Sequence, residues 1–249
     1  MSEIAGKFSE KDVGTSKLVW RIFSLIYKKL VRPLMPPTSA KIRLAGIVVG
    51  NRRLGDGLIT SRIYDPPQVN DVPDYEESLV KALREYVALG DRVVVVGCGT
   101  GVTCAVAAIL SQKRVDCFEG DFEAVEATKR TARLNGVLDK VNVVHAIVGE
   151  NISVYGNSFA EKIMHPSEIP DCDVLELDCE GAELQILREM KIAPRVIAVE
   201  THGVFGSPTE KVRAVLESRG YKVTEFGLAE PRWAAACITN GIEVLVGET

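Results

Sequence analysis

The sequence lacks any long uncharged apolar run, and no stretch approaches the roughly 18 residues that a membrane-spanning helix needs. Its six cysteines form no C-x-x-C pair and no Cys/His cluster with metal-finger spacing. Neither charge nor glycine is extreme, since the net charge is −4, 21 of 249 residues are Gly, and 46% of the residues are hydrophobic. These values exclude a disordered chain, a collagen-like chain and a disulfide scaffold, and they leave one large domain with or without an appendage.

The cysteines and the N-terminus indicate the compartment. Several cysteines lie in apolar, strand-like runs, where cysteine behaves as a small hydrophobic residue. Residues 1–14 are polar and have no signal-peptide core. We therefore expect a reduced, cytoplasmic protein.

Charge is distributed unevenly along the chain. Residues 1–53 carry 11 Lys and Arg against 3 Asp and Glu, a charge of +8, and the remainder carries −12. Such a basic segment suits an anionic partner, and it equally suits the protein's own acidic surface. We predict a basic N-terminal extension over residues 1–73.

The extension contains one helical pattern. Apolar residues recur at three- and four-residue spacing at Val19, Ile22, Phe23, Ile26 and Leu30, and prolines from residue 33 onward end the pattern. This amphipathic helix is predicted to dock on the body or to pair with a second copy in a homo-oligomer. Peripheral membrane contact is the less frequent outcome for such a stripe.

From residue 74 onward, predicted helices alternate with predicted strands. Apolar runs predict seven strands, at residues 93–96, 115–119, 141–146, 174–177, 196–200, 221–226 and 242–246. Helices are predicted to follow Asp74 and Asp121, over residues 102–110 and 180–189, and after a capping box at residues 207–210. Residues 149–170 are predicted to be a small hairpin or loop, and the last two strands are predicted to be joined without a helix.

This alternation predicts the fold class. It is an α/β fold with a doubly wound, seven-stranded and mostly parallel sheet, formed by residues 74–249. The helix-free final connection predicts that the last strand is antiparallel and lies at an edge of the sheet.

A glycine-rich turn follows the first predicted strand. Gly97, Cys98, Gly99 and Gly101 stand where ligands bind in such sheets, beyond the carboxyl ends of the strands. Val102 occupies the place of the third glycine in dinucleotide-binding turns, which disfavours a nicotinamide dehydrogenase. The spacing suits a ligand with one nucleoside and a short charged tail; a turn without a ligand is the alternative.

Acidic residues end the neighbouring strands. Glu119 ends the second strand, where a carboxylate can accept hydrogen bonds from both ribose hydroxyls. Asp178, Glu180 and Glu183 surround the start of the helix after the fourth strand, and the helix dipole alone could account for Glu183. His202 follows the fifth strand on the same rim and titrates near neutral pH, although a structural role is equally consistent with its position.

These residues resemble a known family. The turn at residues 97–101, the acid at Glu119 and the seven-strand pattern look like the class I S-adenosylmethionine-dependent methyltransferases. The stretch Asp178-Cys179-Glu180-Gly181-Ala182-Glu183 reads D-x-E-G-A-E, and residues 196–202 form a strand that ends in Glu near a His. Both are similar to the FkbM family, and the resemblance covers about residues 74–246. Val95 stands where methyltransferases often carry an acid, and Asp178 is the candidate to supply the missing charge.

The resemblance implies a Rossmann-like methyltransferase fold, S-adenosylmethionine as cofactor, and O-methylation of a hydroxyl on a sugar, glycan or small molecule. The cofactor-binding residues it implies are Gly97, Cys98, Gly99, Gly101, Glu119, Ala146 and Asp178. A hydroxyl acceptor benefits from a base, for which His202 ranks first, with Asp178 and Glu180 as the other catalytic candidates. Asp178 and Glu200 could share a divalent ion, but their spacing is no stronger than chance, and no metal is predicted.

Two other classes of function stay open at this stage. One is an RNA methyltransferase whose basic arm binds phosphates. Against it, aromatic residues make up only 6% of the chain and form no cluster suited to stacking on bases. The other is a non-catalytic binding module with the same fold, which Val95 favours because the strand acid is missing there.

Overall fold

The structure is a computed structural model that describes residues 37–53, 71–149 and 162–249. The chain divides into two compact units: residues 1–41 with 51–70, and residues 42–50 with 71–249. The predicted amphipathic helix lies outside the described residues. The candidate site belongs to the second unit.

Three short strands precede the main sheet. They are β1 (Pro37–Leu44), β2 (Ile47–Arg53) and β3 (Asp71–Val72), in the order β2-β1-β3, with β3 parallel to β1. Ala45 and Ile47 are buried in the core of the second unit. The amide group of Asn135 also exchanges two hydrogen bonds with the backbone of Val48, at 3.0 and 2.8 Å. Residues 42–50 therefore pack within the second unit, ahead of the predicted boundary at residue 74.

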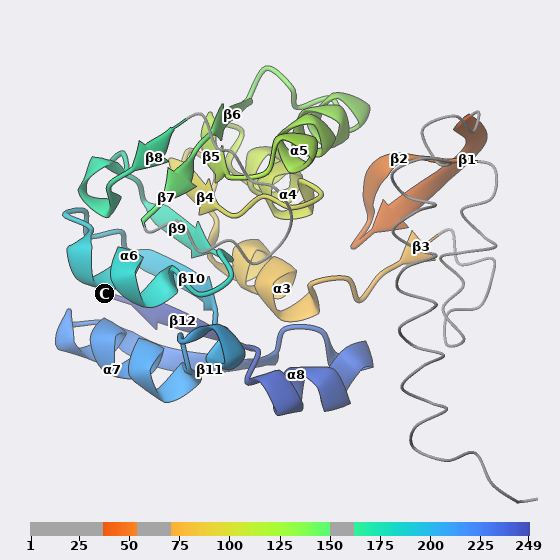
Figure 1. Ribbon diagram of the computed structural model, residues 1–249. Helices are drawn as coiled ribbons and strands as arrows, with labels where there is room; N and C mark the ends of the chain where they lie inside the picture. Colours follow the sequence, from red (N-terminus) through yellow and green to blue (C-terminus); the bar gives the residue numbers. More distant parts are fainter. Residues whose placement is uncertain (1–36, 54–70, 150–161) are drawn as a thin grey trace, which may run out of the picture. The chain divides into compact units, whose positions relative to one another are not determined.

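Seven strands form the main sheet (Figure 1). They are β4 (Val93–Val96), β5 (Val115–Glu119), β6 (Val141–His145), β9 (Val174–Leu177), β10 (Val196–Glu200), β11 (Lys222–Leu228) and β12 (Glu243–Glu248). Their order is β11-β12-β10-β9-β4-β5-β6, and β12 alone among them pairs antiparallel on both sides. The doubly wound, mostly parallel sheet with an antiparallel last strand is thus confirmed.

The predicted edge position of the last strand is wrong. β12 lies between β10 and β11, and its residues Val244, Leu245 and Val246 are fully buried, as an internal strand requires. The connection before it also contains a helix, α8 (Ala234–Asn240). This helix has only seven residues and no strong amphipathic pattern, so its sequence gave no helical signal.

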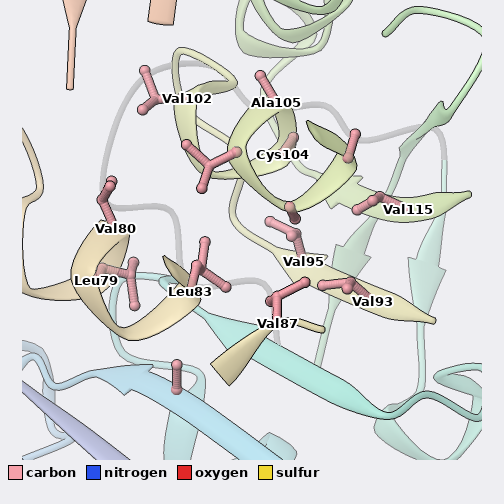
Figure 2. Close-up of a cluster of buried hydrophobic side chains, with 14 of the residues drawn as sticks. Leu79, Val80, Leu83, Val87, Val93, Val95, Val102, Cys104, Ala105 and Val115 are labelled. Carbon is pink, nitrogen blue, oxygen red and sulfur yellow. The ribbon is translucent and has the colours of Figure 1, made fainter. Parts of the chain in front are cut away.

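Helices cover both faces of the sheet, and the strand β4 contributes to both cores. Val93 and Val95 face a core shared with α3 (Glu77–Tyr86), α4 (Val102–Ser111) and α5 (Phe122–Leu134), part of which Figure 2 shows. Val94 and Val96 face a second core shared with α6 (Glu183–Glu189) and α7 (Thr209–Ser218). Alternating side chains of one buried strand therefore fix both layers relative to the sheet.

The predicted helix cap is confirmed at Asp121, and the predicted caps of two other helices are wrong although both helices form. Asp121 caps α5, because its Oδ1 accepts a hydrogen bond from the Ala124 amide at 2.9 Å. α3 is preceded by Glu76 in a left-handed conformation, with no side-chain cap from Asp74. α7 has no capping box either, since the Ser207 hydroxyl donates to the Gly181 carbonyl 2.9 Å away. In both cases tertiary structure overrides the local pattern.

Two further elements differ from the predictions. α6 begins at Glu183 and not near Glu180, because Glu180 and Gly181 have φ angles of 54° and 110°, which a helix cannot contain. β7 (Ile147–Val148) and β8 (Ile163–Met164) pair in parallel, so these two strands do not form a hairpin with each other, and most of the predicted hairpin or loop over residues 149–170 lies outside the described residues. Within the described ranges no helix is long and apolar enough to cross a membrane.

Candidate active site

The glycine-rich turn uses each glycine for a different purpose. A Cβ atom at Gly97 would lie 1.6 Å from the Asp178 carbonyl oxygen, so the backbone of β9 excludes any side chain there. At Gly101 it would lie 2.6 Å from the Thr128 Cα atom, so this glycine lets α4 and α5 approach closely. At Gly99, whose φ is +49°, an added Cβ atom would have no atom within 4 Å apart from its chain neighbours. The turn is therefore closed at both ends and open at its middle.

Glu119 holds the turn from the neighbouring strand. Its Oε2 atom accepts hydrogen bonds from the amides of Cys98 at 2.8 Å and Gly99 at 3.0 Å. Its Oε1 atom accepts from the Asp121 amide at 2.8 Å. A carboxylate oxygen accepts about two hydrogen bonds, so Oε2 is fully used and Oε1 keeps one position for a hydroxyl donor from a ligand.

Cys98 and Ala146 have buried side chains, so they could contact a cofactor only through their backbone atoms. The Cys98 side chain is buried, with its thiol 3.4 Å from the Phe118 carbonyl, so it faces away from the open side of the turn. Ala146 is buried as well, and its amide donates to the Glu119 carbonyl at 2.9 Å. Both predicted cofactor-binding positions lie beside the turn, and their role in binding stays a prediction.

Four carboxylates surround one imidazole on the same rim, and we call this set the acidic cluster: Asp178, Glu180, Glu183, Glu200 and His202. The Nδ1 atom of His202 lies 2.8 Å from Glu183 Oε1. Its Nε2 atom lies 3.5 Å from Asp178 Oδ1, 3.5 Å from Glu200 Oε1 and 3.7 Å from Glu180 Oε2. The positive φ angles of Glu180 and Gly181 delay the start of α6 to Glu183.

Burial and charge shift the pKa values within the acidic cluster. Burial lowers the pKa of His202, but its hydrogen bond to Glu183 and the charge of Asp178 outweigh burial and raise this pKa to about 9. Burial raises the pKa of Asp178 to about 7, and it raises the pKa of Glu200 well above its usual range. Burial also acts on Glu183, yet its bond with His202 keeps the Glu183 pKa below its usual value. The imidazole is thus a cation paired with Glu183, and the crowding of the other carboxyls favours their protonated forms.

The acidic cluster adjoins the glycine turn through the backbone. The Asp178 amide donates to the Val96 carbonyl at 2.9 Å, and the Asp178 carbonyl lies against Gly97. The structure therefore brings together the predicted residues of the turn, Glu119 and the three catalytic candidates. His202 is the most enclosed of those three, because its side chain is only 3% exposed, against 25% for Asp178 and 39% for Glu180. Its ranking as the base stays a prediction.

Two residues of this region, Glu176 and Glu183, have positions that the sequence did not predict. Glu176 pairs with Val95 across β9 and β4, so its side chain lies on the same face as the missing strand acid. It is fully buried, and neither oxygen has a hydrogen-bond partner. Glu183, assigned to the helix dipole alone, is the partner of His202. An acid inside the apolar strand at residues 174–177 was the signal for Glu176, whereas no local signal pairs Glu183 with His202.

The sheet order, the open turn after β4 and the acid at the end of β5 define an α/β protein of the nucleoside-binding methyltransferase class. A family model of the FkbM methyltransferase domain matches residues 68–223, and the chain belongs to this family. The predicted family and its cofactor, S-adenosylmethionine, are thereby confirmed.

Individual relatives are more distant. A ribosomal protein L11 methyltransferase of Bacillus pumilus is 29% identical over 151 residues, which cover 59% of this chain and 42% of that protein. One of Bacillus licheniformis is 36% identical over 90 residues, or 34% of this chain and 29% of the relative. The chain thus spans less than half the length of these curated relatives.

Solved structures are similar at a low level. A ribosomal protein L11 methylase of Lactobacillus delbrueckii has a TM-score of 0.48 at 12% identity, covering 75% of this chain and 89% of the other. An S-adenosylmethionine-dependent O-methyltransferase of Thermotoga maritima has a TM-score of 0.46 at 16% identity, covering 86% and 78%. Similarity at this level carries no information about substrate.

The residues present fit S-adenosylmethionine. The open side of Gly99 leaves space against bare backbone, and Glu119 Oε1 retains one acceptor position for a ribose hydroxyl. Four carboxylates around one imidazole suit a ligand that carries positive charge, because its charge favours their ionised forms. Gly99 and Glu119 would therefore hold the nucleoside, and Asp178 would face the charged end.

Proposed function

We propose that this protein transfers a methyl group from S-adenosylmethionine to a hydroxyl oxygen of a sugar, glycan or other small molecule. The observation that carries the proposal is the contact between the open glycine turn and the acidic cluster, made through the Asp178 backbone. When bound, the cofactor supplies a methyl group already activated by a positive sulfur. The protein must then position the acceptor and accept a proton from it.

The partly exposed carboxylates of the acidic cluster are suited to accepting a proton from the acceptor. A hydroxyl group is a weak nucleophile until a base removes its proton, and Asp178 and Glu180 are the members of the cluster that solvent reaches most. His202 is enclosed, and both of its ring nitrogens face carboxylates. We therefore assign proton acceptance to Asp178 or Glu180 and assign His202 to holding the carboxylates in place.

A protein acceptor is the second candidate, because the curated relatives are named ribosomal protein L11 methyltransferases. The predicted RNA acceptor depends on the basic arm, which lies largely outside the described residues. The three kinds of acceptor can be distinguished, because a protein, an RNA and a sugar or small molecule would each carry the methyl label into a different fraction of a lysate.

The test incubates the full chain and a lysate with cofactor labelled in its methyl group. The lysate is then separated into small molecules, glycans, protein and RNA. We expect label in the small-molecule or glycan fraction, resistant to protease and nuclease. Label that protease releases supports the protein acceptor instead, and label that nuclease releases supports RNA. Calorimetry without heat on adding the cofactor would establish a non-catalytic module.

A further inference from the structure

We propose that Asp178, Glu200 and His202 form a binding site for a first-row divalent cation such as Mn²⁺ or Zn²⁺. One ligand atom from each residue lies within 4.8 Å of the other two. They come from the ends of the adjacent strands β9 and β10. The site therefore lies on rigid sheet elements at the rim that also holds the cofactor turn.

The distances match a ligand shell better than a hydrogen-bond network. His202 Nε2 lies 3.5 Å from Asp178 Oδ1 and 3.5 Å from Glu200 Oε1. Good hydrogen bonds of this kind are about 2.7–3.2 Å long. Ligands about 2.1 Å from an ion at tetrahedral angles lie roughly 3.4 Å apart. His202 Nε2 thus already stands at that separation from each of the two carboxylates, whose own ligand atoms lie within 4.8 Å of each other.

Glu183 gives His202 the support that metal-binding histidines usually have. Its Oε1 atom lies 2.8 Å from His202 Nδ1, and its side chain is fully buried. A buried carboxylate that accepts a hydrogen bond from Nδ1–H fixes the ring and directs Nε2 at the other two carboxylates, where a bound ion would replace the Nε2 proton. This arrangement presents a nitrogen ligand to the centre of the acidic cluster.

Glu200 supplies the independent observation. The residue is only 9% exposed, and its Oε2 atom has no hydrogen-bond partner. Among the ion pairs of the described residues, His202 is the one cation that faces Asp178, Glu180 and Glu200. A buried carboxylate oxygen without a hydrogen-bond partner is costly, and a bound cation would remove that cost.

The donor set indicates which cation is bound. One imidazole nitrogen with carboxylate oxygens suits Mn²⁺, Fe²⁺ or Zn²⁺, whereas Mg²⁺ and Ca²⁺ prefer oxygen alone. Positions left open on the ion would bind the acceptor. This step rests on the proposed function. The acceptor would be a hydroxyl with a second oxygen beside it, as in a vicinal diol, and Glu180 would remain free to accept the proton.

The test uses the full chain after treatment with EDTA and dialysis. It is titrated in a calorimeter with MnCl₂, ZnCl₂ and MgCl₂, without cofactor or acceptor. We expect one Mn²⁺ or Zn²⁺ site per chain, with Mg²⁺ bound at least tenfold more weakly. Glu200→Gln should weaken Mn²⁺ binding by at least tenfold, and Glu183→Gln by about 10- to 100-fold. Glu217→Gln, at an exposed carboxylate on α7, is the matched control and should leave it unchanged.

A second measurement identifies the nitrogen ligand. Pulsed electron paramagnetic resonance of the Mn²⁺ complex should show coupling to a ¹⁴N nucleus, and His202→Gln should abolish it. Circular dichroism confirms that each variant is folded. Absence of saturable binding to the parent chain overturns the proposal, as does affinity unchanged in a folded Glu200→Gln variant.

The two proposals fail separately. If labelled hydroxyl products form but Mn²⁺ and Zn²⁺ do not bind, the cation site is wrong and the methyl transfer stands. Weaker cofactor binding in Glu200→Gln without any metal binding would assign these carboxylates to the cofactor's positive charge, which also overturns the site. If Mn²⁺ binds at His202 but label enters only protein or RNA, the hydroxyl acceptor is wrong.

Discussion

Among single residues, Glu119 has the most direct link to the cofactor. Its carboxylate accepts hydrogen bonds from the amides of Cys98, Gly99 and Asp121. We expect Glu119→Ala to weaken S-adenosylmethionine binding by about tenfold to a hundredfold, because each hydrogen bond to a charged group is worth about 1.5–3 kcal/mol. Isothermal titration calorimetry measures the change. Glu123→Ala, at an exposed position on α5, is the control, and equal affinity in both variants would remove the ribose assignment.

Glu76 makes stability depend on pH. Burial and the charge of Asp178 raise the pKa of Glu76 from 4.5 to about 8. Between these values the folded chain retains a proton that the unfolded chain has lost, so the free energy of unfolding falls as pH rises. Glu76→Gln removes this titration. We therefore expect the variant to gain stability over the parent chain above pH 4.5, by roughly 3 kcal/mol at pH 7.

Urea unfolding of both chains, each in EDTA, tests this at several pH values. The difference between them should vanish near pH 4.5 and grow toward pH 8. A difference that does not change with pH would show that Glu76 ionises normally in the folded chain.

Residue roles that depend on local position could be predicted from the sequence. Asp121 as a helix cap and Glu119 at a strand end are of this kind, since the residues that fix them are close in the chain. The pairing of Glu183 with His202 could not be predicted, because it joins residues 19 apart on two different elements. The buried, unpartnered carboxylate of Glu176 is likewise visible only once β9 lies between β4 and β10.

At the scale of elements, substitutions in the glycine turn should separate effects on folding from effects on cofactor binding. Gly97→Ala places a Cβ atom 1.6 Å from a carbonyl oxygen of β9, and we expect it to destabilise the fold by more than about 3 kcal/mol. An added Cβ atom at Gly99 meets nothing within 4 Å, so we expect backbone strain of about 1–2 kcal/mol to be the main cost of Gly99→Leu. That variant should fold and lose cofactor binding.

Thermal unfolding and calorimetry with S-adenosylmethionine together measure this separation. If Gly99→Leu binds the cofactor as the parent chain does, the open side of the turn is not the binding surface. If Gly97→Ala is as stable as the parent chain, β9 does not close the turn.

The strands were the most predictable elements, because β-branched apolar runs mark positions buried on both faces. Four of them, at residues 93–96, 115–119, 174–177 and 196–200, have the predicted bounds. Element ends governed by tertiary contacts were not predictable. Ser207 bonds to Gly181 and not to its own helix, and the order of β11 and β12 depends on pairing rather than on local pattern.

For the whole molecule, two truncations should have different effects. Deleting residues 1–35 should leave cofactor affinity intact, since the turn, Glu119 and the acidic cluster all lie beyond residue 96. Deleting residues 1–49 also removes the buried side chains of Ala45 and Ile47 and the backbone of Val48 that bonds to Asn135. We expect this second deletion to lower the free energy of unfolding by about 2–4 kcal/mol.

Chemical denaturation and calorimetry of the two truncated chains provide the measurement. Weaker cofactor binding after the shorter deletion would show that the basic extension belongs to the binding unit. Unchanged stability after the longer deletion would show that residues 42–49 contribute no net stability.

The four residues of β4 have a wider consequence. Because Val93 and Val95 anchor one helical layer while Val94 and Val96 anchor the other, neither layer can loosen without disturbing the backbone that leads into Gly97. The backbone that leads into the cofactor turn is therefore held from both faces of the sheet. We expect adjustment to acceptors of different shape to fall to the partly exposed carboxylates of Asp178 and Glu180, so substrate tolerance and cofactor affinity can change independently during evolution.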